Sequence, residues 1–374
     1  RLSIQPKAVS REKKASPRWW KKLAFSLVAV SIVGAATFTL WKFYVWHIPA
    51  TKTLELPDKP SIAVLAFKNL TGDPEQEYFS DGLTEQIING LCKVSDLFVI
   101  ARNSSFAYKG KSIRTKQIAQ ELGVRYILEG SVQKAGDRVR ITAQLIDATT
   151  DYHMWSERYD RDLSDIFALQ DEITMKLISA MQVNLTAGEQ ARLWEGGTTD
   201  IQAYDRLMRG QVCLFRMNDK DNRQAQHFYK AAINIDKEFA WAYAMLGFTH
   251  LLDLLYRWSN SPIKSLEQAE TCAENALTLN DSFDFTHILW GWIYLFRRQH
   301  DEAIKEGERA IELNPNGAEA HVHLGFILCL SDETELAIKL LERAFRLNPI
   351  PLSHYYSFLA MAYRNNGNYD KEIY

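Results

Sequence analysis

The sequence predicts one N-terminal transmembrane helix, then an α+β domain with helices on a mixed sheet, then an all-α repeat solenoid. Three observations predict this order. Residues 23–41 contain no charged side chain. Residues 60–186 combine short β-branched runs, helical periods and period-two alternation. Residues 203–374 repeat small residues at a fixed spacing, as stacked helical repeats do.

Composition and charge place the chain among ordinary globular proteins with a basic N-terminus. The 374 residues are 47% hydrophobic and 24% charged, with a formal net charge of -2. Residues 1–22 nevertheless hold eight basic side chains against Glu12 alone. A basic N-terminal segment followed by a net acidic chain favours contact with anionic lipid. We therefore expect this chain to bind no nucleic acid.

The uncharged stretch lies within residues 23–46, which we predict to be a transmembrane helix. A helix of about 20 apolar residues crosses the hydrocarbon core, and aromatic residues such as Trp20 and Trp41 flank this one at both ends. A cleaved signal peptide has a shorter apolar core and a small-residue cleavage site, and a buried core helix would lack the flanking lysines. The positive-inside rule places residues 1–22 in the cytoplasm as a juxtamembrane stub. Residues after about 47 then lie on the other side of the membrane.

The remaining elements follow in order. Residues 47–59 contain two prolines and no apolar period, so they are predicted to be a linker. The α+β domain, residues 60–186, is predicted to begin with strands at 61–67 and 97–102 and helices at 81–94 and 115–123. An antiparallel meander follows, with a hairpin at 135–137 and a strand through Trp155. A helix at 165–185 is predicted to close the domain. Ser80 or Asp81 is the expected N-cap of the first helix, and Gly123 the C-cap of the second.

The stretch "PSIAVLAFKNLTGDPEQEYFSDGL", residues 60–83, has the strand–loop–helix outline of a phosphate-binding site. It lacks both the P-loop and the dinucleotide-binding glycine patterns. Four carboxylates between Gly72 and Gly82 would repel phosphate while complementing the helix dipole. Alternate oxygens suit Ca²⁺, but the loop is not an EF-hand. We predict a capped, solvated loop and no metal site.

No other pattern indicates catalysis. The four cysteines, Cys92, Cys213, Cys272 and Cys329, lack metal-binding spacing and are expected to be buried free thiols. His321 and His323 are two apart on a predicted helix and therefore point in different directions. We predict no catalytic residue and no cofactor.

Four stretches resemble a known family: "PSIAVLAFKNLTGDPEQEYFSDGLTEQIINGL", "FVIARNSSFAYKGK", "ELGVRYILEGSVQKAGDRVRITAQLIDATT" and "WSERYDRDLSDIFALQDEIT". Together they are similar to the TolB-like amino-terminal domain of bacterial signalling proteins over about residues 57–186. The resemblance implies a preceding membrane span, following tetratricopeptide repeats, and an upstream class III adenylate/guanylate cyclase or winged-helix domain. It supplies no catalytic residues and no established ligand.

Residues 187–202 lose the apolar period and contain Gly196-Gly197, so they are predicted to be a second linker. Beyond them four pairs of small residues or prolines recur 34 positions apart: Gly291 and Gly325, Ala303 and Ala337, Ala310 and Ala344, Pro315 and Pro349. This spacing identifies residues 203–374 as tetratricopeptide repeats. We predict about four repeats plus a truncated one, with about ten extra residues around "YRWSNSPIKS".

Such repeats bind protein or peptide partners in a groove lined by the first helix of each pair. The repeat register predicts these groove residues: Trp241, Phe248, Phe285, Ile288, Trp292, Phe296, Val322 and Phe326. This apolar surface favours an amphipathic helix or an apolar segment over a free C-terminal carboxylate. The alternative is that several of these side chains pack between repeats or against the α+β domain.

Both chain ends look cut, since residue 1 is Arg and the chain stops inside a helical pattern. We expect the membrane-anchored, periplasmic sensory or protein-interaction region of a bacterial inner-membrane signalling protein. It would regulate an upstream class III cyclase, in cAMP signalling, and form a homodimer through that parent cyclase. The alternatives are a non-enzymatic membrane-tethered scaffold and a membrane-bound winged-helix transcription regulator.

Overall fold

The computed structural model describes residues 54–194 and 197–371, which belong to one compact unit beginning at Thr53. The predicted stub 1–22 and transmembrane helix 23–46 lie outside the described residues. Within the described part of the chain, no helix is both long and apolar enough to cross a membrane.

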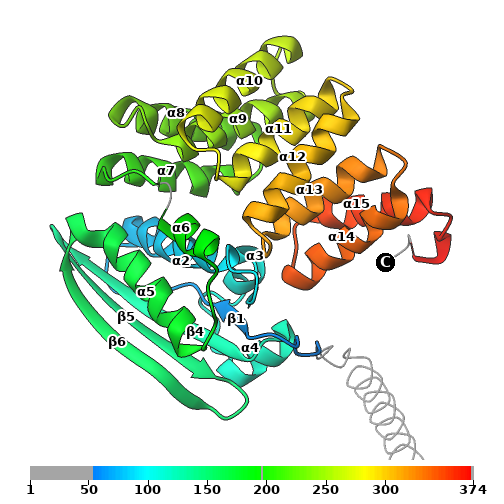
Figure 1. The fold of residues 1–374 in the computed structure, drawn as a ribbon. Coiled ribbons are helices and arrows are strands. Elements are labelled where there is room, and N and C mark those ends of the chain that lie inside the picture. Colours follow the sequence, from blue (N-terminus) through cyan, green and yellow to red (C-terminus); the bar gives the residue numbers. More distant parts are fainter. Residues whose placement is uncertain (1–53, 195–196, 372–374) are drawn as a thin grey trace, which may run out of the picture. The chain divides into compact units, whose positions relative to one another are not determined.

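The α+β domain contains a six-stranded mixed sheet, as predicted (Figure 1). Its strands are β1 (Ser61–Val64), β2 (Lys68–Asn69), β3 (Phe98–Val99), β4 (Tyr126–Ala135), β5 (Arg138–Asp147) and β6 (Tyr152–Asp162). The order is β3-β1-β4-β5-β6, with β2 paired to β4. Strand β1 runs parallel to β3 and β4, whereas β4, β5 and β6 form the antiparallel meander. Gly136, at φ +58°, forms the predicted hairpin turn with Asp137.

The helices of this domain are α2 (Glu77–Cys92), α3 (Arg102–Phe106), α4 (Thr115–Leu122) and α5 (Ile166–Ala180). Gly123 caps α4 at φ +63°, as predicted. The expected start of α2 at residue 81 is wrong, because the helix already begins at Glu77 and Asp81 pairs with Lys109 instead of capping. Helix α5 stops earlier than expected because Gln182, at φ +57°, leaves helical geometry.

The predicted strand at 97–102 is also largely wrong. Only Phe98–Val99 pair as a strand, and Arg102 already begins α3. The backbone N–H of Ala101 donates to the carbonyl of Leu347 in the solenoid at 2.8 Å. A contact with a distant part of the chain therefore ends the strand.

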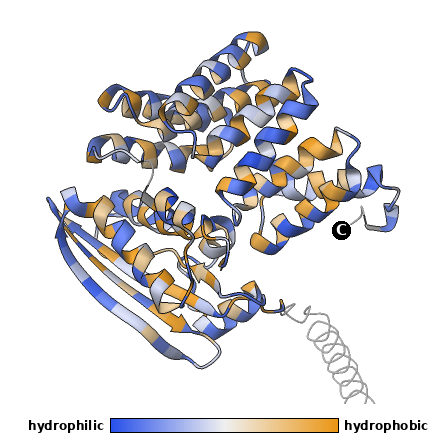
Figure 2. Ribbon diagram, viewed as in Figure 1, coloured by the Kyte–Doolittle hydropathy of each residue, from blue (hydrophilic) through white to orange (hydrophobic). Residues whose placement is uncertain are grey.

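Side chains of the short central strand β1 enter two different cores, because successive residues of a strand face opposite sides of the sheet. Ile62 and Val64 pack with residues of α2, α5 and the meander. Ala63 packs in a second core with solenoid residues that include Val322 and Leu341. Figure 2 shows the outer strand β6 as mostly hydrophilic, so the apolar faces lie further in.

Among the described residues, the solenoid consists of four helix pairs and one further helix. The pairs are α7 (Ile201–Leu214) with α8 (Asp219–Ile235), α9 (Ala240–Leu255) with α10 (Pro262–Leu279), α11 (Asp284–Phe296) with α12 (His300–Leu313), and α13 (Ala318–Cys329) with α14 (Thr334–Leu347), followed by α15 (Ser353–Asn365). A Cβ on Gly325 would lie 2.7 Å from Cγ of Leu341, so the glycine permits close helix pairing. The four cysteines are buried and free, as expected.

The segment expected as a plain linker, 187–202, carries helix α6 (Ala187–Trp194). The carboxylate of Glu189 accepts hydrogen bonds from the backbone N–H and hydroxyl of Ser95, both at 2.7 Å, and from those of Thr186, both at 2.8 Å. Burial alone would raise the pKa of Glu189, but these bonds lower it to about 2. The segment is therefore docked on the α+β domain.

The prolines at the repeat ends confirm the repeat pattern and add a contact that it did not reveal. Pro315 and Pro349 follow the last residues of α12 and α14, as predicted. The loop after Pro315 docks on the α+β domain, since the side-chain amide of Asn316 donates to the carbonyl of Val94 at 2.8 Å. Beside Pro349, the hydroxyl of Ser104 donates to Asn348 Oδ1 at 2.6 Å. The solenoid is thus bonded to the segment after α2 and to α3 at two successive repeats.

Candidate partner-binding site

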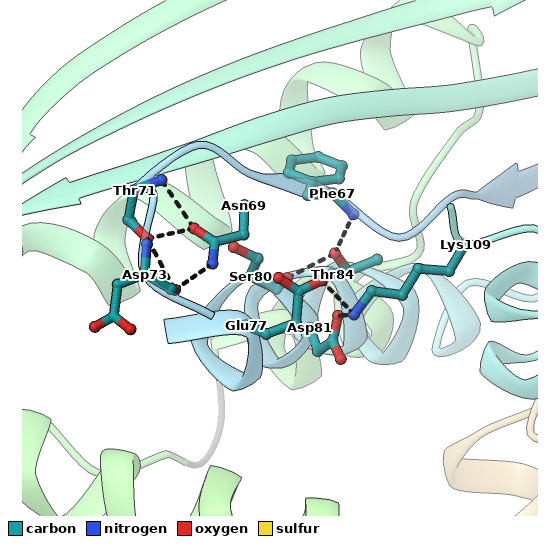
Figure 3. Close-up of polar contacts among 9 residues, drawn as sticks. All are labelled: Phe67, Asn69, Thr71, Asp73, Glu77, Ser80, Asp81, Thr84 and Lys109. Carbon is teal, nitrogen blue, oxygen red and sulfur yellow. Dashed lines mark hydrogen bonds and ion pairs between the residues drawn. The ribbon is translucent and has the colours of Figure 1, made fainter. Parts of the chain in front are cut away.

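Polar groups of Asn69, Thr71 and Asp73, in the loop between β1 and α2, bond to one another (Figure 3). Asn69 Oδ1 accepts from the backbone N–H and the hydroxyl of Thr71, at 2.9 and 2.6 Å, and its amide donates to the carbonyl of Asp73 at 2.8 Å. Asp73 Oδ1 accepts from the N–H of Glu75 at 2.9 Å and caps a short 3₁₀ turn. The capped loop predicted from the sequence is what the structure shows.

The acidic side chains that follow are held by Lys109. Its ammonium lies 2.7 Å from Glu77 and 2.5 Å from Asp81 (Figure 3). Burial raises the pKa of Asp81, and the Lys109 bond opposes that rise. Among the described residues, no group of three or more His, Cys, Asp or Glu is arranged to hold a metal ion. This region is therefore held together by internal contacts.

A cavity of about 730 Å³ lies between the inner helices of the solenoid and the α2 and α5 helices of the α+β domain. The inner helices are the first helices of the pairs, α7, α9, α11 and α13, together with α15. Five of the eight predicted groove residues line this aromatic cavity: Trp241, Phe248, Phe285, Trp292 and Phe326. Their role as partner contacts stays a prediction.

The other three predicted residues lie elsewhere. Ile288 and Val322 are buried in the helix-packing cores. Phe296 is 37% exposed and is not part of the cavity wall, although its ring lies 6.1 Å from that of Trp292. For Ile288 and Val322 the packing alternative accounts better for the structure, because an inner helix has a second apolar side that faces its own repeat.

Aromatic stacking organises one end of the cavity. The ring of Trp292 stacks on Phe326 at 5.2 Å, and Phe326 stacks on Phe358 at 4.1 Å. These side chains come from α11, α13 and α15, so the stack crosses three repeats. Such rings form a rigid apolar surface that loses little side-chain entropy when a partner binds.

A polar chain continues from this stack. The indole N–H of Trp292 donates to His323 Nδ1 at 2.9 Å. Because an indole N–H only donates, Nδ1 must accept, and the His323 proton lies on Nε2, which is 3.4 Å from Glu319. Burial would raise the pKa of Glu319, but the His323 bond lowers it. Glu319 is thus an oriented carboxylate of the cavity lining, beside the apolar stack.

The α+β domain supplies the opposite wall. Arg102 of α3 forms an ion pair with Glu85 at 3.1 Å, and its guanidinium lies 4.1 Å from the ring centres of both Phe106 and Phe215. Burial raises the pKa of Glu85, whereas Arg102 acts to lower it. Phe167 of α5 also lines the cavity and meets Tyr204 edge-on at 5.3 Å.

Sequence reasoning missed Phe358, His323 and this second wall. Phe358 falls two positions short of the 34-residue register from Phe326, so the spacing did not mark it. His321 and His323 do point apart: His321 bonds the carbonyl of Gly317 at 2.9 Å, and only His323 lines the cavity. Only the fold brings Arg102 to the solenoid.

Comparison with protein families gives two matches. Residues 58–176 match a family described as HilA/YgeH-like transcriptional regulator, second domain. Residues 287–316 match the tetratricopeptide repeat, which confirms the repeat prediction. The expected TolB-like character of the α+β domain has only weak support.

A curated relative from Rhizobium meliloti (strain 1021) is named "Putative adenylate cyclase 3". It is 46% identical over 257 residues, which cover 69% of this chain and 44% of the relative. The chain therefore spans less than half of that protein's length.

Several solved structures are similar at low identity. MamA from Desulfovibrio magneticus RS-1 is 17% identical, with a TM-score of 0.33 over 46% of this chain and 90% of that one. YrrB, described as a TPR protein with an unusual peptide-binding site, is 19% identical, with a TM-score of 0.30 over 45% and 81%. TolB from Acinetobacter baumannii is 16% identical, with a TM-score of 0.25 over 35% and 30%.

Proposed function

We propose that the chain is the partner-binding, regulatory part of a membrane-anchored bacterial signalling protein whose output is a class III nucleotide cyclase. One observation carries the binding half of the proposal. Aromatic side chains from four inner helices, including Trp241, Trp292, Phe326 and Phe358, surround a cavity of about 730 Å³. A fully packed core would have filled that space.

The chemistry of the cavity defines the partner. Its aromatic walls favour an apolar protein segment, and an amphipathic helix presents apolar side chains along one face. The tetratricopeptide match supports a protein partner. The name of the Rhizobium relative supports a cyclase output in the complete protein.

The membrane placement is also part of the proposal. Residues 23–46 would anchor the chain, and everything after about residue 47 would lie in the periplasm. A change caused by partner binding there would be transmitted through the transmembrane helix to the cytoplasmic output domain. A periplasm-dependent reporter fused after Asp58 should be active. Activity of a cytoplasm-dependent reporter at the same position would refute this topology.

A transcription regulator is the second candidate, and the family match over residues 58–176 favours it. In that case the output would be a DNA-binding domain, and the same cavity would still recruit a protein partner. A non-enzymatic scaffold would have neither output.

One experiment separates the three. The complete gene product is expressed in bacteria that lack their own adenylate cyclase, and cAMP and promoter binding are both measured. We expect cAMP to accumulate, and residues 48–374 alone to give none. Promoter binding without cAMP would establish the regulator, and the absence of both outputs would leave the scaffold.

A further inference from the structure

The turn between α9 and α10 is the insertion that makes the second repeat longer than the others. From Leu254 to Leu266 the sequence is LLYRWSNSPIKSL, which contains Arg257 and Lys264 but no acidic residue. Large apolar side chains are exposed on it: Leu255 by 40%, Tyr256 by 49% and Ile263 by 74%.

The corresponding turns of the other repeats have a different charge. Residues 215–221 and 297–302 each contain two carboxylates, and residues 330–335 contain three. The first, third and fourth turns are therefore acidic or mixed in charge. The α9–α10 turn alone combines uncompensated positive charge with exposed apolar side chains.

The turn holds its shape through internal contacts. Arg257 adopts φ +56°, and the N–H groups of Trp258 and Ser259 donate to the carbonyl of Asp253 at 3.0 and 3.3 Å. The rings of Tyr256 and Trp258 stack at 4.9 Å with an interplanar angle of 20°. Arg257 and Lys264 are exposed and form no ion pair with any residue the structure describes.

We infer that the α9–α10 turn docks on an anionic lipid surface. Tyr and Trp beside a branched apolar side chain and two cations match the interfacial region of a bilayer, where rings sit among headgroups and cations meet anionic lipid. The two cations supply the charge complementarity that selects anionic lipid over a neutral surface. Residues 254–266 contain no carboxylate, and the exposed Glu267 follows them on α10.

Because the proposed anchor already holds the chain at the membrane, a weak contact between the α9–α10 turn and lipid is sufficient for docking. If residues 23–46 span the membrane, the linker 47–59 is at most roughly 45 Å long, which keeps the lipid at a high effective concentration. The inference is separate from partner binding in the cavity, because that binding is measured without lipid. Docking of the turn would hold the solenoid at the surface while the cavity engages its partner.

The test uses residues 53–374, which form a compact unit of their own. They are floated with vesicles of phosphatidylcholine alone or with about one third phosphatidylglycerol. We expect binding only to the anionic vesicles, with a loss as salt rises. Arg257→Gln with Lys264→Gln should lower the partition coefficient about 25-fold, and Ile263→Ser about tenfold.

The matched control is Leu336→Ser with Lys339→Gln, since these side chains are also exposed but lie on α14. The control should bind anionic vesicles like the unaltered protein, and all variants should melt at the same temperature. Equal binding to both vesicle types, or an equal loss in the control, would overturn the inference. Retention of mixed-sequence RNA without vesicle binding would overturn it as well, in favour of a nucleic acid.

Discussion

The loop after β1 and the aromatic groove of the solenoid were both candidate sites in the sequence. In the structure the loop is closed by its own polar contacts, whereas the aromatic side chains line an open cavity. In the loop, Asn69, Thr71 and Asp73 bond to one another, and Lys109 forms ion pairs with Glu77 and Asp81. In the cavity, the rings of Trp292, Phe326 and Phe358 stack on one another yet leave a space of about 730 Å³.

The difference shows what to look for in a binding site of this kind. Polar groups that already have partners gain little from a ligand, because binding would have to replace existing bonds. Apolar surface that faces an open cavity gains free energy when a partner displaces water. Changes in the loop should therefore alter stability, and changes in the cavity wall should alter binding.

The largest effect is expected at Phe358. Phe358→Ala removes one end of the aromatic stack and should weaken partner binding by about 2–4 kcal/mol, as at interface hot spots. Affinity is measured by calorimetry with amphipathic helical peptides selected on the unaltered protein.

Phe296→Ala is the matched control, because Phe296 was a predicted groove residue that does not line the cavity. Its affinity should stay within twofold of the unaltered protein. A larger loss of peptide affinity in Phe296→Ala than in Phe358→Ala would instead support the groove predicted from the repeat register.

The next effect tests the loop as structure. The Thr84 hydroxyl accepts from the N–H of Phe67 at 3.1 Å and donates to the carbonyl of Ser80 at 2.8 Å, and Thr84 and Phe67 are fully buried (Figure 3). Thr84→Val leaves that N–H unpaired and should lower the free energy of unfolding by about 2 kcal/mol. Urea denaturation measures it.

Thr84→Ser keeps the hydroxyl and should recover most of the lost stability. Peptide affinity should be unchanged in both variants. If Thr84→Val weakened peptide binding as strongly as Phe358→Ala, the separation between loop and cavity would fail.

A smaller, pH-dependent effect is expected at Glu189. Its pKa in the folded protein, about 2, is below the ordinary value of 4.5, so its stabilisation is complete above pH 4.5 and is lost as the pH falls toward 2. Glu189→Gln should cost about 1–2 kcal/mol at pH 7. The difference from the unaltered protein should shrink in acid, which denaturation curves from pH 7 to pH 3 would show. A difference that grows in acid would contradict the assigned bonds.

The smallest effect is expected at Lys109, whose ammonium is partly exposed. Lys109→Gln should lower the free energy of unfolding by less than about 1 kcal/mol, as for surface ion pairs. ATP added to either protein should release no heat of binding. Saturable ATP binding that depends on Lys109 would make the loop a phosphate site after all.

The sequence by itself determined the mixed α+β order, the hairpin at Gly136, the cap at Gly123 and the tetratricopeptide repeat. Each depends on short-range patterns: alternation in strands, helical period, a left-handed glycine and a fixed 34-residue spacing. Five of the eight residues that the same register named line the cavity, and their contact with a partner stays a prediction.

Only the tertiary structure decided where contacts between residues far apart in the chain override these local patterns. The carbonyl of Leu347 ends the strand at Ala101, and Ser95 with Glu189 docks a segment that looked like a linker. Arg102 enters the cavity wall because the loops at Asn316 and Asn348 fasten the solenoid to the α+β domain. Local periodicity carries no information on such pairings, because their free energy depends on residues far apart in the chain.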